Sequence, residues 1–242
     1  MSETQGPKPG VEAAGAVNPV PVVTVDGPSG AGKGTLSVAL AGRLGWHFLD
    51  SGALYRLTAW QALEAGLALE DVPAVAEAAR ELDVRFELDG QGGYQSMIGV
   101  EPVDQLIRDE RVAAAASKVA ALQPVRDALL QRQRDFRAAP GLVADGRDMG
   151  TVVFPDAPCK IFITASPEER ARRRYEQLKA QGAGVTLRAL LDDIQARDQR
   201  DRERSSAPLK PAADAHLLDT TELTIEAVVE AAWLFIQRQL VL

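Results

Sequence analysis

Residues 22–35, VVTVDGPSGAGKGT, place glycines, a lysine and a threonine directly after a short apolar run. Gly27, Gly32 and Lys33 follow the spacing G-x-x-x-x-G-K of phosphate-binding loops. Backbone N–H groups can surround a phosphate chain only where side chains do not block the approach, which is why such loops are rich in glycine. A helix that starts after Gly32 adds further N–H donors. The pattern therefore predicts a phosphate-binding loop in which Lys33 reaches the outer phosphates of a nucleotide.

The loop departs from the commonest form of its pattern at one position. Ser or Thr usually follows the lysine directly, whereas here Gly34 intervenes and Thr35 follows. This spacing is typical of nucleoside monophosphate kinases, and we interpret Thr35 as the hydroxyl on the Mg²⁺ side of bound ATP. The predicted ATP-binding residues are Gly27, Pro28, Ser29, Gly30, Ala31, Gly32, Lys33, Gly34 and Thr35. The alternative is a glycine-rich turn that binds nothing, but strand, glycines, lysine and helix occur in the expected order.

A phosphate-binding loop alone does not identify a reaction. GTP-hydrolysing switches need an N-K-x-D element, and the only asparagine in the chain is Asn18. His47 and His216 are the only histidines, and the sequence pattern shows neither a Ser-His-Asp arrangement nor a metal site. What the sequence does offer is arginine, and phosphoryl transfer requires positive charge around the group in transit.

Charged residues follow two further apolar runs. Ser51 ends one run, and Arg56 lies about one and a half helical turns later, so the two can face a single anion. A helix cap beside a solvated arginine is the alternative there. Asp145, Arg147 and Asp148 lie within four positions at the end of another run, beside glycines. Because charges packed at a strand end contribute little to a fold, we favour a functional role for this second cluster.

An arginine-rich segment near residue 200 forms a third cluster. Arg197, Arg200, Asp201 and Arg204 are separated by spacings of three, four and seven positions, which put them on one face of a helix. A salt-bridged solvent face is the alternative, and we prefer it for Arg202.

Five short apolar runs that alternate with helical patterns position these clusters. The runs span residues 21–25, 47–52, 141–146, 159–165 and 215–220. Such alternation predicts a parallel sheet with helices on both faces, and ligands of such sheets bind beyond the carboxyl ends of the strands. The phosphate-binding loop and the first two charged clusters follow strands in this way.

Two segments interrupt the alternation. Residues 84–103 alternate apolar and polar side chains across the turn signal DGQGG, which predicts an inserted antiparallel hairpin that covers a substrate. Gly182 and Gly184 separate two arginine-rich helices, where we expect a lid that excludes water when both substrates are bound. The expected organisation is a flexible tail at 1–18 and a kinase domain at 19–242, with the insertion at about 74–105 and the lid at about 172–187.

Five segments occur in the following order: DGPSGAGKGT, DSGALYR, ADGRDMGTVVFPDAP, RDQRDRERSSAPL, and AD followed by LLDT. Through them, residues 20–240 resemble the bacterial cytidylate kinase family. The resemblance implies the P-loop NTPase fold, an α/β fold with a five-stranded parallel sheet flanked by helices, a small antiparallel NMP-binding insertion and a short lid. It also implies transfer of the γ-phosphoryl group of ATP to CMP or dCMP, with Mg²⁺, in pyrimidine nucleotide metabolism.

The family's functional residues match positions of this sequence. The resemblance implies catalytic roles for Lys33, Arg147, Arg197 and Arg204, and a CMP site of Ser51, Arg56, Ser117, Arg126, Arg147, Asp148, Arg197, Asp201 and Arg204. It places the acceptor phosphate at Ser51, Arg56, Arg147 and Arg204, the sugar hydroxyl at Arg197 and Asp201, and the base at Ser117, Arg126 and Asp148. A carboxylate such as Asp148 accepts from the N4 amine of cytosine and repels the O4 of uracil.

Two parts of this assignment are less specific. For Ser117 and Arg126, an exposed amphipathic helix is the alternative without the resemblance. Arg172, Arg173 and Arg174 include lid residues that are expected to close over ATP, but the sequence does not distinguish among them.

The composition constrains partners and compartment. The formal net charge of −7 argues against a protein that binds nucleic acid or membrane surfaces. Cys159 is the single cysteine, no apolar run approaches the roughly 20 residues of a membrane span, and the N-terminus lacks a signal-peptide pattern. We expect a cytoplasmic monomer whose partners are ATP, CMP and dCMP. Two alternatives stay open: a kinase for another nucleoside monophosphate such as UMP or AMP, and a P-loop protein that binds RNA without catalysis.

Overall fold

The computed structural model describes residues 20–240, apart from 90–92, 108, 181 and 183. In this part of the chain, five strands form one parallel sheet in the order β2-β6-β1-β7-β8. They are β1 (Val22–Asp26), β2 (His47–Asp50), β6 (Leu142–Gly146), β7 (Cys159–Thr164) and β8 (His216–Asp219). The predicted strands and their parallel arrangement are confirmed. The predicted tail at 1–18 lies outside the described residues.

The central strand β1 is buried along its whole length because it pairs with β6 on one side and β7 on the other. Val22 packs into one hydrophobic cluster, whereas Val23 and Val25 pack into the cluster on the opposite face. A strand covered on both faces reads as a continuous apolar run, and this is the pattern that the sequence shows.

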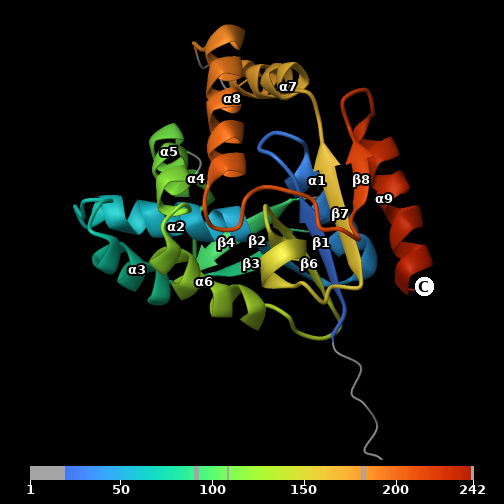
Figure 1. The fold of residues 1–242 in the computed structure, drawn as a ribbon, viewed down its shortest axis with the longest axis horizontal. Helices are drawn as coiled ribbons and strands as arrows, with labels where there is room; N and C mark the ends of the chain where they lie inside the picture. The colour runs from blue at the N-terminus through green and yellow to red at the C-terminus, as the bar shows by residue number, and fades with distance from the viewer. Residues whose placement is uncertain (1–19, 90–92, 108, 181, 183, 241–242) are drawn as a thin grey trace, which may run out of the picture.

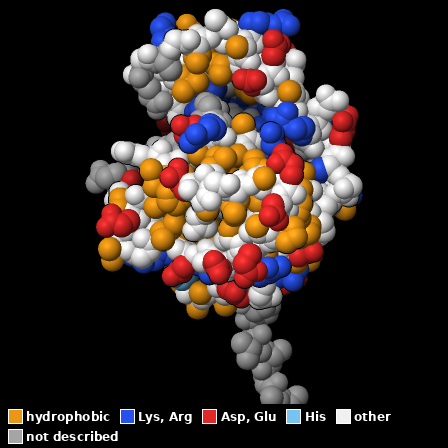
Figure 2. Space-filling view, turned by 90° about the vertical axis from the view of Figure 1, so that its left-hand side faces the viewer, with side chains coloured by type: hydrophobic (Ala, Val, Ile, Leu, Met, Phe, Trp, Pro, Cys, Tyr) orange, Lys and Arg blue, Asp and Glu red, His pale blue; other side chains and the backbone are white. Residues whose placement is uncertain are grey.

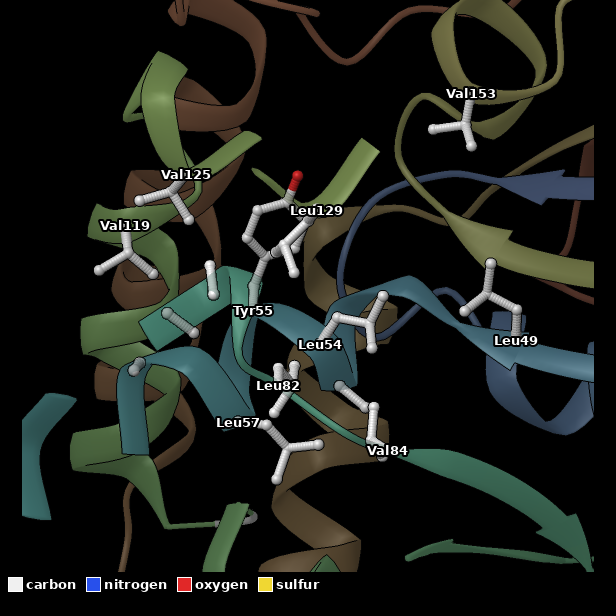
Figure 3. Close-up of a cluster of buried hydrophobic side chains, with 14 of the residues drawn as sticks. Leu49, Leu54, Tyr55, Leu57, Leu82, Val84, Val119, Val125, Leu129 and Val153 are labelled. Carbon is white, nitrogen blue, oxygen red and sulfur yellow. The ribbon is translucent and has the colours of Figure 1, made fainter. Parts of the chain in front are cut away.

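Helices cover both faces of the sheet. On one face, α1 (Lys33–Leu44) and α9 (Ile225–Leu240) bury the cluster that contains Val23 and Val25. On the opposite face α2 (Ser51–Glu64) packs on β6, and in the same hydrophobic cluster α3 (Val72–Arg80) and α5 (Glu110–Val119) pack against α2, and α6 (Gln123–Asp135) packs against α3. Figure 3 shows part of this second cluster, in which Leu54 and Tyr55 of α2 lie near Leu129 of α6.

A separate antiparallel sheet lies beside β2. It consists of β3 (Arg85–Leu88), β4 (Tyr94–Ile98) and β5 (Glu101–Pro102). β3 and β4 are the predicted hairpin, and β5 is a further strand that the prediction lacked. The rings of Tyr94 and Phe86 pack on Phe48 of β2, with centroids 4.7 and 6.1 Å from it, so aromatic contacts attach the small sheet to the main one. The expected limits of the insertion fall inside α3 and α4 (Asp104–Ile107) rather than at their ends.

Two long helices extend beyond the sheet. α7 (Pro167–Ala180) follows β7, and α8 (Leu187–Glu203) packs against α7. Figure 1 shows α7 beyond the carboxyl end of β7, and α8 running from there back down toward α2. Gly182, with a left-handed φ of 79°, lies in the break between them, where the sequence predicted the separation. In the part of the chain that the structure describes, no helix has both the length and the apolarity to cross a bilayer.

Candidate active site

The loop after β1 is pressed against neighbouring elements at two glycines. Gly27 has a φ of 151°, and a Cβ there would lie 2.2 Å from the carbonyl oxygen of Ile163 on β7. Gly30 has a φ of 78°, and a Cβ there would lie 3.3 Å from the Cβ of Arg170 on α7. The loop ends at Gly32, the N-cap of α1. The backbone N–H groups of this glycine-rich loop and those at the N-terminus of α1 together suit the binding of an anion.

Lys33 lies at the start of α1 with its ammonium group buried against the loop. Its Nζ donates a hydrogen bond to the carbonyl oxygen of Pro28 at 2.9 Å and lies 4.0 Å from Oδ1 of Asp145 at the end of β6. Burial, together with the nearby Arg147, lowers the pKa of Lys33 to about 7, although Asp145 opposes the shift. Burial likewise raises the pKa of Asp145 to about 6. A bound phosphate chain would supply further negative charge to this ammonium group and favour its protonated form.

A cavity of about 740 Å³ opens beside the loop. The loop and the first turn of α1 contribute Gly30 to Leu36 to its lining, including the exposed Thr35. α7 contributes Arg172, Arg173 and Arg174, the three arginines among which the sequence predicts lid residues that close over ATP. The structure therefore brings these arginines and the phosphate-binding loop to one cavity.

The same cavity has an apolar wall that the sequence pattern does not predict. This wall is made by the C-terminal segment, through Leu223, Thr224, Ile225, Val228 and Val229. Leu223 and Ile225 are exposed apolar side chains. Exposure of single apolar residues at the start of an amphipathic helix is common and gives no signal of a site by itself.

Ser51 and Arg56, at the start of α2, are both held by neighbouring side chains. Ser51 Oγ donates to Oε1 of Gln133 at 2.8 Å, and Arg56 pairs with Asp50 at 2.8 Å. Asp50 caps α2 and also accepts a hydrogen bond from the hydroxyl of Tyr94 on the small sheet. Burial opposes ionisation of Asp50, but Arg56 and Tyr94 hold its pKa below its usual value.

The end of α8 meets the end of β6 through charged side chains. Nε of Arg147 donates to Oδ2 of Asp201 at 3.1 Å, and Nη2 of Arg204 lies 3.8 Å from Oδ1 of Asp148. Within the described residues, the buried Nε of Arg197 and Nη2 of Arg204 have no hydrogen-bond partner. Burial lowers the pKa of Arg197 to about 10. Unsatisfied buried donors of this kind fit a site that binds an anion. Figure 2 shows Lys and Arg side chains along the walls of a hollow on one face of the molecule.

The three residues that the sequence predicts at the base, Ser117, Arg126 and Asp148, take part in two separate contacts. Arg126 of α6 and Asp148 form a buried ion pair. Ser117 of α5 instead accepts a hydrogen bond from Nε of Arg200 on α8 at 3.3 Å. The backbone that follows Asp148 is held by Asp26, because the carboxylate of Asp26 accepts hydrogen bonds from the N–H groups of Met149 and Gly150. Asp26 was missed in the sequence because it reads as the polar end of a buried strand.

A parallel sheet with a glycine-rich loop after its central strand, and arginines that line a cavity with that loop, define a P-loop phosphotransferase. The family model of cytidylate kinase matches residues 23–238. The chain belongs to the cytidylate kinase family.

Curated relatives agree with this family. A cytidylate kinase from Pseudomonas aeruginosa (strain UCBPP-PA14) is 62% identical over 221 residues, which are 91% of this chain and 96% of that protein. A cytidylate kinase from Stutzerimonas stutzeri (strain A1501) is 61% identical over 216 residues, which are 88% of this chain and 94% of that protein. Among solved structures, a gluconokinase from Sinorhizobium meliloti 1021 has a TM-score of 0.47 at 14% identity, covering 90% of this chain and 93% of that chain.

Proposed function

We infer that the protein transfers the γ-phosphoryl group of ATP to CMP or dCMP, giving ADP and CDP or dCDP. One relationship carries this inference: Lys33, at the start of α1, and Arg147 both lie beside the carboxyl end of β6. Nζ of Lys33 lies 4.0 Å from Asp145, and Arg147, two residues further on, pairs with Asp201 of α8. A phosphoryl group that leaves ATP beside Lys33 therefore moves toward positive charge.

The donor nucleotide is proposed to bind in the cavity beside the loop. Its phosphates are assigned to the loop residues 27–35, whose glycines allow close backbone approach. Its adenine is assigned to the apolar wall, where the exposed Leu223 and Ile225 fit a flat apolar ring. Arg172, Arg173 and Arg174 line the same cavity and supply positive charge.

The proposed site offers Mg²⁺ only a few protein oxygen atoms as ligands. In the described residues, no group of three or more His, Cys, Asp or Glu side chains is placed to hold a metal ion. The hydroxyl of Thr35 lines the cavity, and Oδ2 of Asp145 would lie 3.7 Å from a Cβ at Gly34. Such a sparse oxygen set suits Mg²⁺, which keeps waters and substrate phosphates as its other ligands. We propose Thr35 as the residue on the metal side, where the ion neutralises phosphate charge.

The acceptor requires positioning rather than a catalytic base. The second pKa of a phosphate monoester is about 6, so its oxygen is mostly ionised at neutral pH. The proposed contacts of its phosphate are Ser51, Arg56, Arg147 and Arg204, those of its sugar are Arg197 and Asp201, and those of its base are Ser117, Arg126 and Asp148. In the described residues, the buried Nε of Arg197 and Nη2 of Arg204 have no hydrogen-bond partner, which supports the anion site.

The finer organisation also follows from this proposal. We propose one kinase domain at 19–242, with the insertion at 74–105 beside the acceptor and a lid at 172–187 over ATP. We also propose a cytoplasmic monomer that acts on free nucleotides, and the net charge of −7 argues against nucleic acid as a partner.

An assay that couples ADP release to a spectroscopic signal tests the proposed function. ATP and Mg²⁺ are supplied with CMP, dCMP, UMP, AMP or GMP, and with no acceptor. We expect rapid turnover with CMP and dCMP, and slow turnover with the others. Turnover that favours another acceptor would overturn the assignment of Ser117, Arg126 and Asp148 to the base. ADP release that does not depend on an acceptor would overturn the kinase assignment itself.

A further inference from the structure

Arg170, in the first turn of α7, has a side chain that is buried almost completely, with 1% exposure. Its Nε donates to the carbonyl oxygen of Ala165 at 2.9 Å, and its Nη1 donates to the carbonyl oxygen of Ser29 at 3.0 Å. Nη1 and Nη2 also donate to the two carboxylate oxygens of Asp198, at 2.9 and 2.6 Å. All three nitrogen atoms of the guanidinium group therefore donate hydrogen bonds within the protein.

These contacts join three parts of the proposed site. Ser29 belongs to the phosphate-binding loop, and the Cβ of Arg170 packs against that loop at Gly30. Arg170 also lines the cavity in which ATP is proposed to bind, together with Arg172, Arg173 and Arg174 of the same helix. Asp198 lies on α8, directly after Arg197, and is 3% exposed. One buried ion pair thus connects the loop to α7 and α8, two of the helices that carry proposed substrate-binding arginines.

Stability alone gives little reason for a charged pair in this place. Apolar side chains of similar volume often stabilise a fold as well as a buried ion pair does, because desolvation of the charges is costly. An apolar pair, however, could not bind the carbonyl oxygen of Ser29. It would also lack the bidentate geometry with Asp198, which fixes direction as well as distance.

We propose that Arg170 and Asp198 are positioning residues that hold α7 and α8 in register with the phosphate-binding loop. The charges of both helices are thereby placed relative to the phosphoryl group in transit. This inference rests on the proposed function. Placement matters because a displacement of about 1 Å can cost on the order of 100-fold in rate.

Arg170→Lys tests the pair while keeping its buried positive charge. Lysine lacks the planar fork and cannot reproduce all four hydrogen bonds. We expect kcat with CMP to fall at least about tenfold. We also expect the ratio of ADP formed to CDP formed to rise, because misplaced helices leave the γ-phosphoryl group open to water. A purely structural role would not change this ratio.

Asp198→Asn and Asp198→Glu repeat the test from the other partner. The first removes the charge, and the second keeps the charge but lengthens the side chain, so both are expected to raise the ratio of ADP to CDP. Each assay is run at a temperature where circular dichroism shows the variant to be folded. If one variant does not fold, the other two still decide the result.

Arg137→Lys is the matched control. Arg137 also binds a backbone carbonyl oxygen, of Val20, and a carboxylate, of Asp156, each at 2.7 Å, but next to the amino end of β1. We expect this control to leave kcat and the ratio of ADP to CDP unchanged. An unchanged ratio in the folded variants of Arg170 and Asp198 would overturn the inference, whatever happens to Tm. Failure of the wild-type protein to phosphorylate CMP would instead refute the proposed function.

Discussion

The guanidinium of Arg126 and the carboxylate of Asp148 form a buried ion pair in the part of the site where the acceptor base is proposed to bind. The two residues come from different elements, since Arg126 lies on α6 and Asp148 follows β6. A base that contacts both must offer a donor to the carboxylate and an acceptor to the guanidinium. Cytosine offers its N4 amine and its N3 or O2, whereas uracil has an oxygen in place of the amine. The pair therefore has the chemistry to discriminate between the two bases.

Replacing Asp148 by Asn is expected to reduce the preference for CMP over UMP. Hydrogen-bond discrimination of a base is worth about 1–3 kcal/mol, so the ratio of kcat/KM for CMP to that for UMP should fall by about fivefold to 150-fold. The KM for ATP should stay close to the wild-type value. Steady-state kinetics with both acceptors measures these quantities. A raised KM for ATP with an unchanged base preference would show that Asp148 does not contact the base.

Replacing Lys33 by Met is expected to remove activity without a loss of stability. Removing one preorganised charge contact typically costs about 10²–10³ in kcat. Burial lowers the pKa of Lys33 to about 7, which shows that the fold disfavours its charge, so we expect Tm to rise or stay the same. Enzyme assays and thermal unfolding measure the two effects. A large drop in Tm would contradict the expectation that the charge of Lys33 is unfavourable to the fold, and activity close to wild type would contradict its role in the reaction.

Asp26 is expected to make the protein less stable as pH rises from about 4 to 7. Its carboxylate accepts from the N–H groups of Met149 and Gly150, yet burial raises its pKa from 3.8 to about 7. The folded protein thus binds this proton more tightly than the unfolded chain does. The resulting stabilisation is fully present below about pH 4 and is lost as pH rises through about 7.

Asp26→Asn tests this pH dependence. The free energy of unfolding, measured by denaturant titration between pH 4 and 8, should change less with pH in the variant than in the wild type. Asp145 and Asp148 also lie near Asp26 and are present in both proteins, so the difference between the two curves isolates Asp26. Identical pH dependence in the two proteins would contradict the raised pKa.

Replacing Ile225 by Asp is expected to weaken ATP binding selectively. Ile225 is 60% exposed and lines the apolar wall of the cavity, so the change should leave the fold intact and place a negative charge where adenine is proposed to bind. The KM for ATP should rise several-fold and the KM for CMP should not. Leu234→Asp is the control, because Leu234 lies on the same helix, is 48% exposed and does not line the cavity. Equal effects of the two variants would contradict the assignment of adenine to this wall.

Hydrogen exchange is expected to slow in peptides from residues 175–187 when CMP and a non-hydrolysable ATP analogue are both bound. A lid that closes over two substrates should gain little protection from CMP alone. Mass spectrometry of the exchanged peptides measures this difference. No added protection with both nucleotides would contradict a lid at 172–187.

The sequence predicts those parts of the site that have a local pattern. The loop from Gly27 to Thr35 is continuous in the chain, and the short apolar run before it identifies its strand. Asp50 and Arg170 have no such pattern, because their partners meet them only after folding. Asp50 binds Tyr94 from the small sheet, and Arg170 binds an aspartate on a different helix. Their spacing in the sequence therefore resembles that of ordinary surface charges.

The fate of a labelled phosphoryl group tests the central claim most directly. The protein is incubated with Mg²⁺, CMP and ATP that carries radioactive phosphorus in its γ position, and the products are separated by chromatography. We predict that the label appears in CDP in the same amount as the ADP formed. Label recovered as inorganic phosphate, with none in CDP, would contradict the assignment of this protein as a kinase that acts on CMP.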